Sequence, residues 1–472
     1  MTVRPLLGAD RGGFVERHGL WDDAAHAAAA QLRRVVDERG IELVRVVFAD
    51  QHGVLHGKAF TRDALPGVLR DGCTVPSSLL LKDTSGRSVY PVFSAGGGVG
   101  VPGLGGAGDV VLVPDPTTFR VLPWADRTGW VLCDLRFPDG RAVPLCTRGI
   151  ARRVLGGLAD RGHDLVVGVE LEFFVSRDGD PEPLVPGGRL LHEEALDALD
   201  DVVGLVRGAL DGLGLPLRSI EPEFGAGQLE ITLAPRGGLE AADAVVLART
   251  AIRQVCRRAG YRATFMSRPV GAAVSSGWHL HQSLVERATG ANAFVPDGAG
   301  PLSPLGTGWL AGLLRHAPGA AVFTTPTVNG YKRYQRLSLA PDRICWGLDN
   351  KGAMVRVVGG AGDPATRLEN RSGEPAANPY LYVASQVISG LAGIDGGLDP
   401  GPPTDTPYDD DAARRLPADL GEALDALCAD AVLTEGLGRE VVDWLLALKR
   451  AEVLRHRSEV SAWEQREYGE LF

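Results

Sequence analysis

Apolar and polar residues follow helical and strand periods in several segments of the N-terminal quarter of the chain. Residues 22–39 are rich in alanine and place apolar side chains at helical spacing, which predicts a helix. Residues 42–49 and the segment after them are apolar and β-branched, which predicts two strands joined by a turn at residues 50–53. With a short helix near residues 63–69, these elements predict a small α+β domain that ends near residue 115.

The rest of the chain predicts a larger domain in which strands and helices alternate. A strand ends at residue 134, and a long strand covers residues 164–175. Periodicity and cap residues predict helices from about residue 148, at 193–213, at 238–260 and at 378–394, and two closing helices after a loop at 401–417. Because 472 residues exceed the usual size of one core, we expect an α+β fold with domains at 1–115 and 116–472.

Composition narrows the class of protein. Apolar residues make up 44% and charged residues 23% of the chain, as in ordinary globular proteins, and no apolar run is long enough for a membrane span or a signal core. The net charge of −10 disfavours a nucleic-acid surface. Six cysteines without a C-x-x-C pair indicate reduced thiols. We therefore expect a cytoplasmic protein with no nucleic-acid or membrane partner.

Paired carboxylates are the first candidates for chemistry. Glu170 and Glu172 lie in an apolar run, and the period of a strand places both on one face, where their charges repel unless a cation binds. Glu223 and Glu230 flank a glycine-containing turn that brings them near each other. The two pairs are also compatible with a solvent-facing strand edge and an acidic surface hairpin.

Histidines and arginines extend this set. His279, His281 and Ser283 alternate on one predicted strand, as metal ligands or phosphate donors would, although packing histidines can show the same pattern. The segment 329–371 carries cations suited to carboxylates and phosphates together with one acid, namely Arg333, Lys351, Arg356, Arg367, Glu369 and Arg371. A two-metal hydrolase would use a similar set, but the arginines favour phosphoryl transfer.

Five motifs in one order resemble the signatures of glutamine synthetases. They are Glu170-x-Glu172, Glu223 to Glu230 with Gly227-Gln228, Ser276-Gly277-x-His279-x-His281-x-Ser283, Asn329-x-Tyr331-Lys332-Arg333, and Glu369-x-Arg371 with Ala377-Asn378-Pro379-Tyr380. The match covers nearly the whole chain. The resemblance implies a β-grasp-like small domain, a catalytic antiparallel sheet flanked by helices, and a homo-oligomeric ring, hexamer or dodecamer, with active sites between subunits.

The resemblance also implies a role for each matching residue. Two Mg²⁺ or Mn²⁺ ions would be held, one by Glu172, Glu223 and Glu230 and the other by Glu170, His279 and Glu369. Glutamate would be contacted by Arg333, Arg371 and His279. The nucleotide would be contacted by His281, Ser283 and Arg367, and the transferred phosphate by Arg356 and Lys351. The implied reaction uses ATP to convert glutamate into γ-glutamyl phosphate, from which a nitrogen nucleophile displaces phosphate.

Departures from the family pattern indicate which nucleophile is used. Ammonia-using members carry a Glu at the position of Leu339, and the acid of their Phe-Asp-Gly-Ser-Ser motif is absent from Val75-Pro76-Ser77-Ser78. Lys351 also replaces an arginine. Our leading hypothesis is therefore a ligase that joins glutamate to an organic amine, with Leu339 in the acceptor pocket. The alternatives are ordinary glutamine synthesis, a non-catalytic ring-forming scaffold and a two-metal hydrolase.

Overall fold

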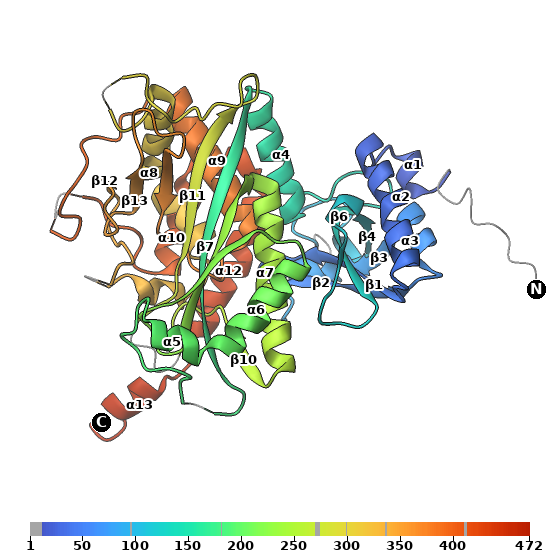
Figure 1. Cartoon of the computed structure of the whole chain (residues 1–472), viewed down its shortest axis with the longest axis horizontal. Coiled ribbons are helices and arrows are strands. Elements are labelled where there is room, and N and C mark those ends of the chain that lie inside the picture. Colours follow the sequence, from blue (N-terminus) through green and yellow to red (C-terminus); the bar gives the residue numbers. More distant parts are fainter. Residues whose placement is uncertain are drawn as a thin grey trace, which may run out of the picture.

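The computed structural model of the chain describes residues 12–94, 97–180, 182–269, 274–298, 300–335, 338–409 and 413–472. Figure 1 shows a small N-terminal unit beside a larger unit that contains long strands and most of the helices. Each unit is built on its own sheet, and helices accompany both sheets. The expected α+β class is confirmed.

The small sheet has the strand order β2-β1-β6-β4-β3, with β5 paired to β6. Its strands are β1 (Leu43–Ala49), β2 (Leu55–Thr61), β3 (Cys73–Pro76), β4 (Asp109–Pro114), β5 (Arg120–Val121) and β6 (Thr128–Arg136). Helices α1 (Phe14–Arg17), α2 (Asp23–Glu38) and α3 (Leu65–Asp71) lie beside it (Figure 1). Because β6 runs between β1 and β4, the boundary expected at residue 115 falls inside this sheet, and we propose that the small domain ends after Arg136.

The large sheet has the order β12-β13-β14-β11-β7-β9-β8, with β10 paired to β7. Its strands are β7 (His163–Arg177), β8 (Leu217–Pro222), β9 (Gln228–Gly237), β10 (Tyr261–Thr264), β11 (Trp278–Glu286), β12 (Trp346–Leu348), β13 (Val355–Val358) and β14 (Arg367–Asn370). Every pairing is antiparallel except that of β12 with β13. Leu171 and Phe173 are fully buried on one face of β7, so the alternating Glu170 and Glu172 lie on the other.

Helices pack against the apolar face of this sheet and against one another. They are α4 (Thr147–Ala159), α7 (Gly238–Arg258), α8 (Pro304–Thr324), α9 (Pro379–Asp395), α10 (Leu420–Ala429), α11 (Ala431–Leu437) and α12 (Arg439–Arg457). Asn378 caps α9 by accepting from the amides of Tyr380 and Leu381, as its sequence predicts. None of the helices in the described residues is long and apolar enough to cross a membrane.

Two helical predictions need correction. The single helix expected at 193–213 is divided at Leu199 into α5 (Glu193–Ala198) and α6 (Asp200–Gly212). Four helices, not two, follow the loop at 401–417, because α10, α11 and α12 succeed one another closely and α13 (Ala462–Tyr468) comes after them. Capping by Asp430 starts α11 directly after α10.

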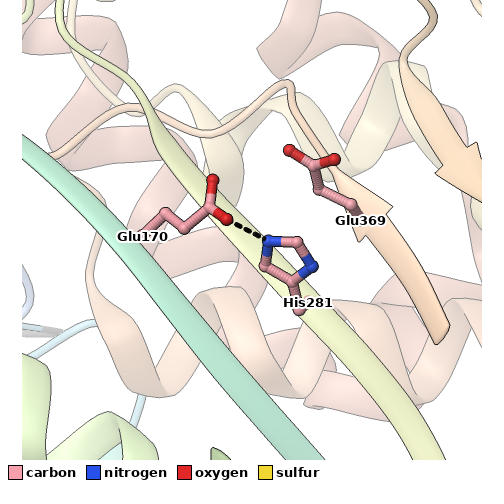
Figure 2. A group of neighbouring side chains, drawn as sticks. All are labelled: Glu170, His281 and Glu369. Carbon is pink, nitrogen blue, oxygen red and sulfur yellow. Dashed lines mark hydrogen bonds and ion pairs between the residues drawn. The ribbon is translucent and has the colours of Figure 1, made fainter. Parts of the chain in front are cut away.

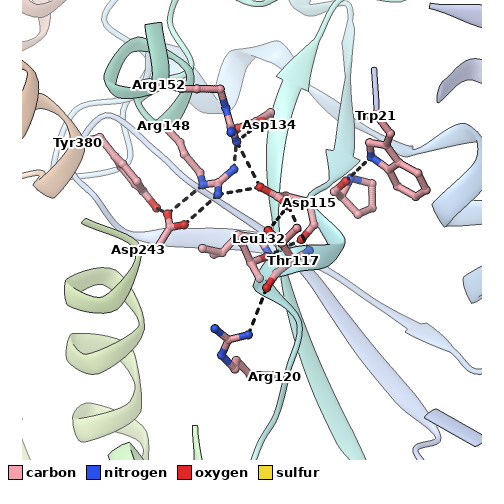
Figure 3. A network of polar contacts seen from close by, with 12 residues as sticks. Trp21, Asp115, Thr117, Arg120, Leu132, Asp134, Arg148, Arg152, Asp243 and Tyr380 are labelled. Atoms are coloured by element: carbon pink, nitrogen blue, oxygen red, sulfur yellow. Dashed lines mark hydrogen bonds and ion pairs between the residues drawn. The ribbon is translucent and has the colours of Figure 1, made fainter. Parts of the chain in front are cut away.

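A buried arginine joins the two domains (Figure 3). Arg148, at the start of α4, donates to Asp115 at 2.9 Å and Asp134 at 3.1 Å in the small domain, and to both oxygens of Asp243 on α7 at 2.9 Å. Tyr380 on α9 also donates to Asp243, at 2.7 Å. One guanidinium therefore holds together elements from three parts of the chain.

A second set of contacts ties loops of the small domain to the C-terminal part of the chain. Asn378 Nδ2 donates to the carbonyl oxygen of Asp50 at 2.9 Å. Trp444 Nε1, on α12, donates to the carbonyl oxygen of Leu80 at 2.7 Å, and Arg455 pairs with Asp83. The small domain is thus fixed to the large one at two separate places.

Candidate functional site

Charged side chains from neighbouring strands converge on the face of the large sheet that is turned away from the helices. Strand pairing places Glu170 opposite His279 and Glu172 opposite Glu230. His281 lies opposite Glu369, which in turn lies opposite Arg356 on β13. The cluster therefore follows from period-two alternation combined with this strand order.

Glu170 is the central carboxylate of the cluster (Figure 2). Its Oε1 lies 2.8 Å from His281 Nε2, and its Oε2 lies 3.1 Å from His279 Nδ1. His279 Nδ1 is also 3.6 Å from Glu369 Oε1. Residues that are far apart in sequence are thus within bonding distance of one another.

Two groups of side chains can each hold a metal ion, and they share Glu170. One comprises Glu170, His281 and Glu369, and the other Glu170, Glu230 and His279, with the ligand atoms of each group within 4.8 Å of one another. These groups overlap only partly with the two expected sets. His281, expected on the nucleotide side, lies among the possible ligands.

Glu172 and Glu223 belong to neither of these two groups, although Glu172 lies opposite Glu230. Glu172 Oε2 accepts hydrogen bonds from Gln228 Nε2 at 2.7 Å and from the amide of Gly277 at 3.0 Å. Glu223 follows β8, at the turn toward β9, where burial raises its pKa and the charge of the exposed Lys351 lowers it in part.

Electrostatics show that the acidic side of the cluster lacks positive charge. Burial, followed by repulsion from Glu223, raises the pKa of Glu172 to about 8, and burial with repulsion from Glu172 raises the pKa of Glu230 further. Burial also raises the pKa of Glu369, but the charges of Arg371 and His279 outweigh it and leave the pKa at about 2. Carboxylates that repel one another in this way suit divalent cations.

Sequence reasoning missed Glu221, which lies opposite Glu230 in the pairing of β8 with β9. Its charge contributes to the raised pKa of both Glu223 and Glu230. The spacing Glu221-x-Glu223 repeats that of Glu170-x-Glu172, so the same period-two argument could have identified it.

Two buried arginines next to the cluster retain free donors. Arg333 is 2% exposed and donates through Nη1 to the carbonyl oxygen of Ser372 at 2.9 Å, while Arg371 pairs with Glu369. Within the described residues, the Nε atom of each is buried without a partner. Unpaired guanidinium donors in a buried site suit a carboxylate ligand.

A cavity of about 1450 Å³ opens beside the cluster and includes Glu170, His281, Ser283 and Arg367 in its wall. The three residues expected on the nucleotide side therefore share one cavity, where Arg367 Nε lies 3.1 Å from His281 Nδ1. Arg356 lies on β13, next to the edge strand β12. It donates to Glu369 at 2.9 Å and to Asp349 at 2.9 Å.

Leu339 lies outside that cavity, and its side chain is 43% exposed. Its φ of +59° is uncommon for a residue with a branched side chain. Burial raises the pKa of Tyr408, whereas the Leu339 backbone and the charge of Arg371 lower it. Leu339 is therefore an exposed apolar residue outside the cavity that holds the nucleotide-side residues.

Comparisons with known proteins agree with this geometry. Residues 144–468 match the family model described as glutamine synthetase, catalytic domain. The chain is 44% identical to a γ-glutamylanilide synthase of Acinetobacter sp., over 97% of this chain and 99% of that protein. It is 30% identical to a glutamine synthetase of Halobacterium salinarum, over 96% and 99% of the two chains.

A solved structure of GmaS in complex with ADP superposes with a TM-score of 0.81 at 30% identity, covering 93% of this chain and 99% of that one. The family model thus begins just after the small sheet ends and covers the whole large sheet. Because the family match spans more than half of the chain and the relatives cover nearly all of it, the chain belongs to the glutamine synthetase family of ligases.

Proposed function

We propose that the protein is an ATP-dependent ligase that joins the γ-carboxylate of glutamate to an organic amine with an apolar skeleton. One combination of features carries this proposal. The cluster of carboxylates, histidines and arginines is suited to phosphoryl transfer, and an exposed Leu339 stands where ammonia-using members of the family carry a Glu. The 44% identity to a γ-glutamylanilide synthase supports the choice of an aromatic amine.

The proposed reaction has two steps. The γ-phosphoryl group of ATP passes to the γ-carboxylate of glutamate, and ADP leaves. The amine nitrogen then attacks the acyl carbon, the acyl carbon–oxygen bond to phosphate breaks, and the departing phosphate takes the proton that the nitrogen loses. Arg333 and Arg371 would hold the α-carboxylate through their free donors, while Arg356, Arg367 and Lys351 would meet phosphate oxygens. These groups orient the reactants and offset negative charge.

The acidic cluster fits two divalent cations. Carboxylate oxygens suit Mg²⁺ and Mn²⁺, and Glu170, Glu230 and Glu369 offer them, with Glu172 and Glu223 next to them. His279 and His281 would complete the two groups. When bound, such ions neutralise triphosphate charge and polarise phosphoryl oxygens.

Apolar groups near Glu223 support the proposed acceptor. Phe224, which directly follows Glu223, is 40% exposed, and Leu191 is 65% exposed. The amide of Leu191 donates to the carbonyl oxygen of Pro222 at 3.0 Å, which holds the two loops together. Burying an aryl ring against such side chains contributes about 25 cal/mol for each Å² of apolar surface removed from water.

The test measures ADP release with ATP, glutamate and a panel of ammonium, an alkylamine, a polyamine and aniline. We expect aniline to give the highest kcat/KM, because Leu339 offers an ammonium ion no compensating charge and an aryl amine arrives unprotonated. Leu339→Glu should lower kcat/KM for aniline by about tenfold and raise it for ammonium. Leu339→Met is the matched control and should keep the preference of the unmodified enzyme.

Glutamine synthesis from ammonia is the second candidate, favoured by the 30% identity to a glutamine synthetase. Ammonium outperforming every organic amine in the unmodified enzyme would establish it and end the first proposal. For the whole molecule we propose a closed ring, hexameric or dodecameric, in the cytoplasm. The resemblance to ring-forming glutamine synthetases supports the ring.

A further inference from the structure

A second cavity, of about 680 Å³, lies away from the carboxylate cluster, between the two domains. Its wall is formed by the β1–β2 turn, one side of α7, strand β10, the end of α8 and the middle of α12. In Figure 1, α7 runs between β2 and the large sheet and ends near β10. The volume suits a small organic molecule.

The wall of this cavity is positively charged although the chain carries a net charge of −10. Its charged residues are Arg249, Arg253, Arg257, Arg262 and Lys449, accompanied by His52, and none of the described residues in its wall is Asp or Glu. Lys449 is already paired with Glu452 at 2.9 Å, so the positive charge of the wall comes from the arginines. Arg253, Arg257 and Arg262 are exposed, and no ion pair involves them within the described part of the chain. Three guanidinium groups are thus available to an anion.

Arg249 lies at the bottom of the cavity and is only 8% exposed. It donates to the carbonyl oxygens of Gly53, Pro375 and Ala377 at 2.8 to 3.0 Å, and no carboxylate pairs with it among the described residues. The nearby Asp50 already accepts from the amides of His52 and Val54 and from His56. Burial lowers the pKa of Arg249 to about 10, in keeping with a buried charge that is held by carbonyl oxygens.

The remaining wall combines apolar side chains with polar ones, and it contains an unused acceptor. Phe265, Leu381 and Leu445 contribute buried apolar surface, and Met266 is 43% exposed. Gln51 Oε1 is buried without a hydrogen-bond partner in the described residues. A ligand that combines an anionic group with an apolar body therefore fits, and a hydroxyl or amine on it would also satisfy Gln51.

We propose that this cavity is a binding site for a small organic phosphate, distinct from the ATP-binding cavity. The guanidinium groups of Arg253, Arg257 and Arg262 would hold the phosphate, because planar forks match its oxygens. The apolar wall would cover the organic body. The site goes beyond the ligase reaction, in which none of these residues takes part.

The same cavity adjoins the segment that carries Arg333. Thr327 and Asn329 line it, and the backbone amide of Thr327 donates to Glu374 at 2.8 Å. The side-chain amide of Asn329 accepts from the backbone amide of Arg268 and donates to the carbonyl oxygen of Arg268. Asn329 directly precedes the short helix Gly330–Arg333. We therefore expect an occupant that contacts Thr327 and Asn329 to shift Arg333 and to alter the KM for glutamate.

Calorimetric titration of the full chain with inorganic phosphate and with phenyl phosphate, without metal, tests the site. Both probes should bind, phenyl phosphate at least about tenfold more tightly. The double variant Arg257→Gln, Arg262→Gln should raise both Kd values at least about tenfold. Arg258→Gln is the matched control, because Arg258 is exposed on the same helix outside the cavity wall. It should leave both values unchanged, as should Arg367→Gln in the other cavity.

Absence of binding to the unmodified protein would overturn the proposal. So would loss of binding in Arg367→Gln with the double variant unaffected, since that places the probe in the ATP-binding cavity. Equal Kd values for the two probes would exclude the role of the apolar wall. In kinetic assays, saturating phenyl phosphate should change the KM for glutamate at least about threefold in the unmodified enzyme and not in the double variant. An equal change in both would refute the coupling to Arg333.

Discussion

Gly277 occupies the point where three functional side chains meet. A Cβ atom at this position would lie 3.0 Å from His279 Nε2, 3.1 Å from Arg333 Nη2 and 3.3 Å from Glu172 Oε1. We expect Gly277→Ala to push these groups apart by tenths of an ångström and to lower kcat/KM for glutamate by about tenfold, with the fold retained. Steady-state kinetics and circular dichroism check this.

Gly204→Ala is the matched control, because a Cβ atom there would meet nothing within 4 Å. It should leave kinetics unchanged. Comparable losses in both variants would mean that the close approach around Gly277 is unimportant.

Glu172, Glu223 and Glu230 give metal binding a predictable pH dependence. Burial raises the pKa of all three carboxyl groups in the metal-free protein, so the folded chain retains protons that the unfolded chain loses. Stability from these groups is therefore present at low pH and declines as pH rises toward the folded pKa values. Divalent ions need the deprotonated ligands, so binding must release protons.

We accordingly expect Mn²⁺ to raise the unfolding temperature more at pH 8 than at pH 6. Calorimetric titration in two buffers with different ionisation enthalpies should show net proton release at pH 7. Proton uptake, or equal stabilisation at both pH values, would contradict the electrostatic account.

At the scale of single residues, the sequence predicts which side chains share a strand face but not which strands lie together. Alternation alone places Glu170 with Glu172 and His279 with His281. Glu369 joins Glu170 only because β14 pairs with β11 and β11 with β7. The strand order depends on the packing of the whole sheet. Without the family resemblance, the sequence could therefore not predict which carboxylates and histidines form each metal group.

At the scale of elements, helices with one apolar stripe were predicted well, and α8 was not predicted. The sequence of α2 has a polar face and a cap at Asp22, which fix its position within a residue. Helix α8 is buried over most of its surface and contains Pro318, so it has no polar face to give a helical period. Helix α8, in the core of the large domain, is therefore an element that sequence periodicity cannot identify.

The buried Arg148 between the two domains should contribute more to the free energy of unfolding than its exposed neighbour Arg152. Arg148→Met leaves Asp115, Asp134 and Asp243 without their buried partner, and we expect a loss of about 3 to 5 kcal/mol in the free energy of unfolding. Arg152 contacts two of the same carboxylates, but its side chain is 47% exposed, so Arg152→Met should cost about 1 kcal/mol or less. Urea titrations of the two variants make the comparison.

Similar losses of unfolding free energy in the two variants would show that the ion pairs of Arg148 are no stronger for being buried. Retained stability in Arg148→Met would show that the two domains are held together by their other contacts alone.

At the scale of the whole molecule, the proposed ring predicts that activity depends on assembly. If the site is completed by a neighbouring subunit, dilution below the assembly concentration should abolish turnover, because each isolated subunit lacks part of its acceptor pocket. Light scattering coupled to size exclusion, with activity measured across the peak, tests this. An active monomer at assay concentration would contradict the ring proposal.

The contacts between the small domain and the distant end of the chain also set an order of events during synthesis. The carbonyl group of Asp50 meets its Asn378 partner only after a further 328 residues, and that of Leu80 meets Trp444 after 364. At about 5 to 20 residues per second, a ribosome needs roughly 15 to 75 seconds to supply these partners. The nascent small domain must therefore persist undocked for that time, with the surface that later receives α12 open to chaperones and proteases.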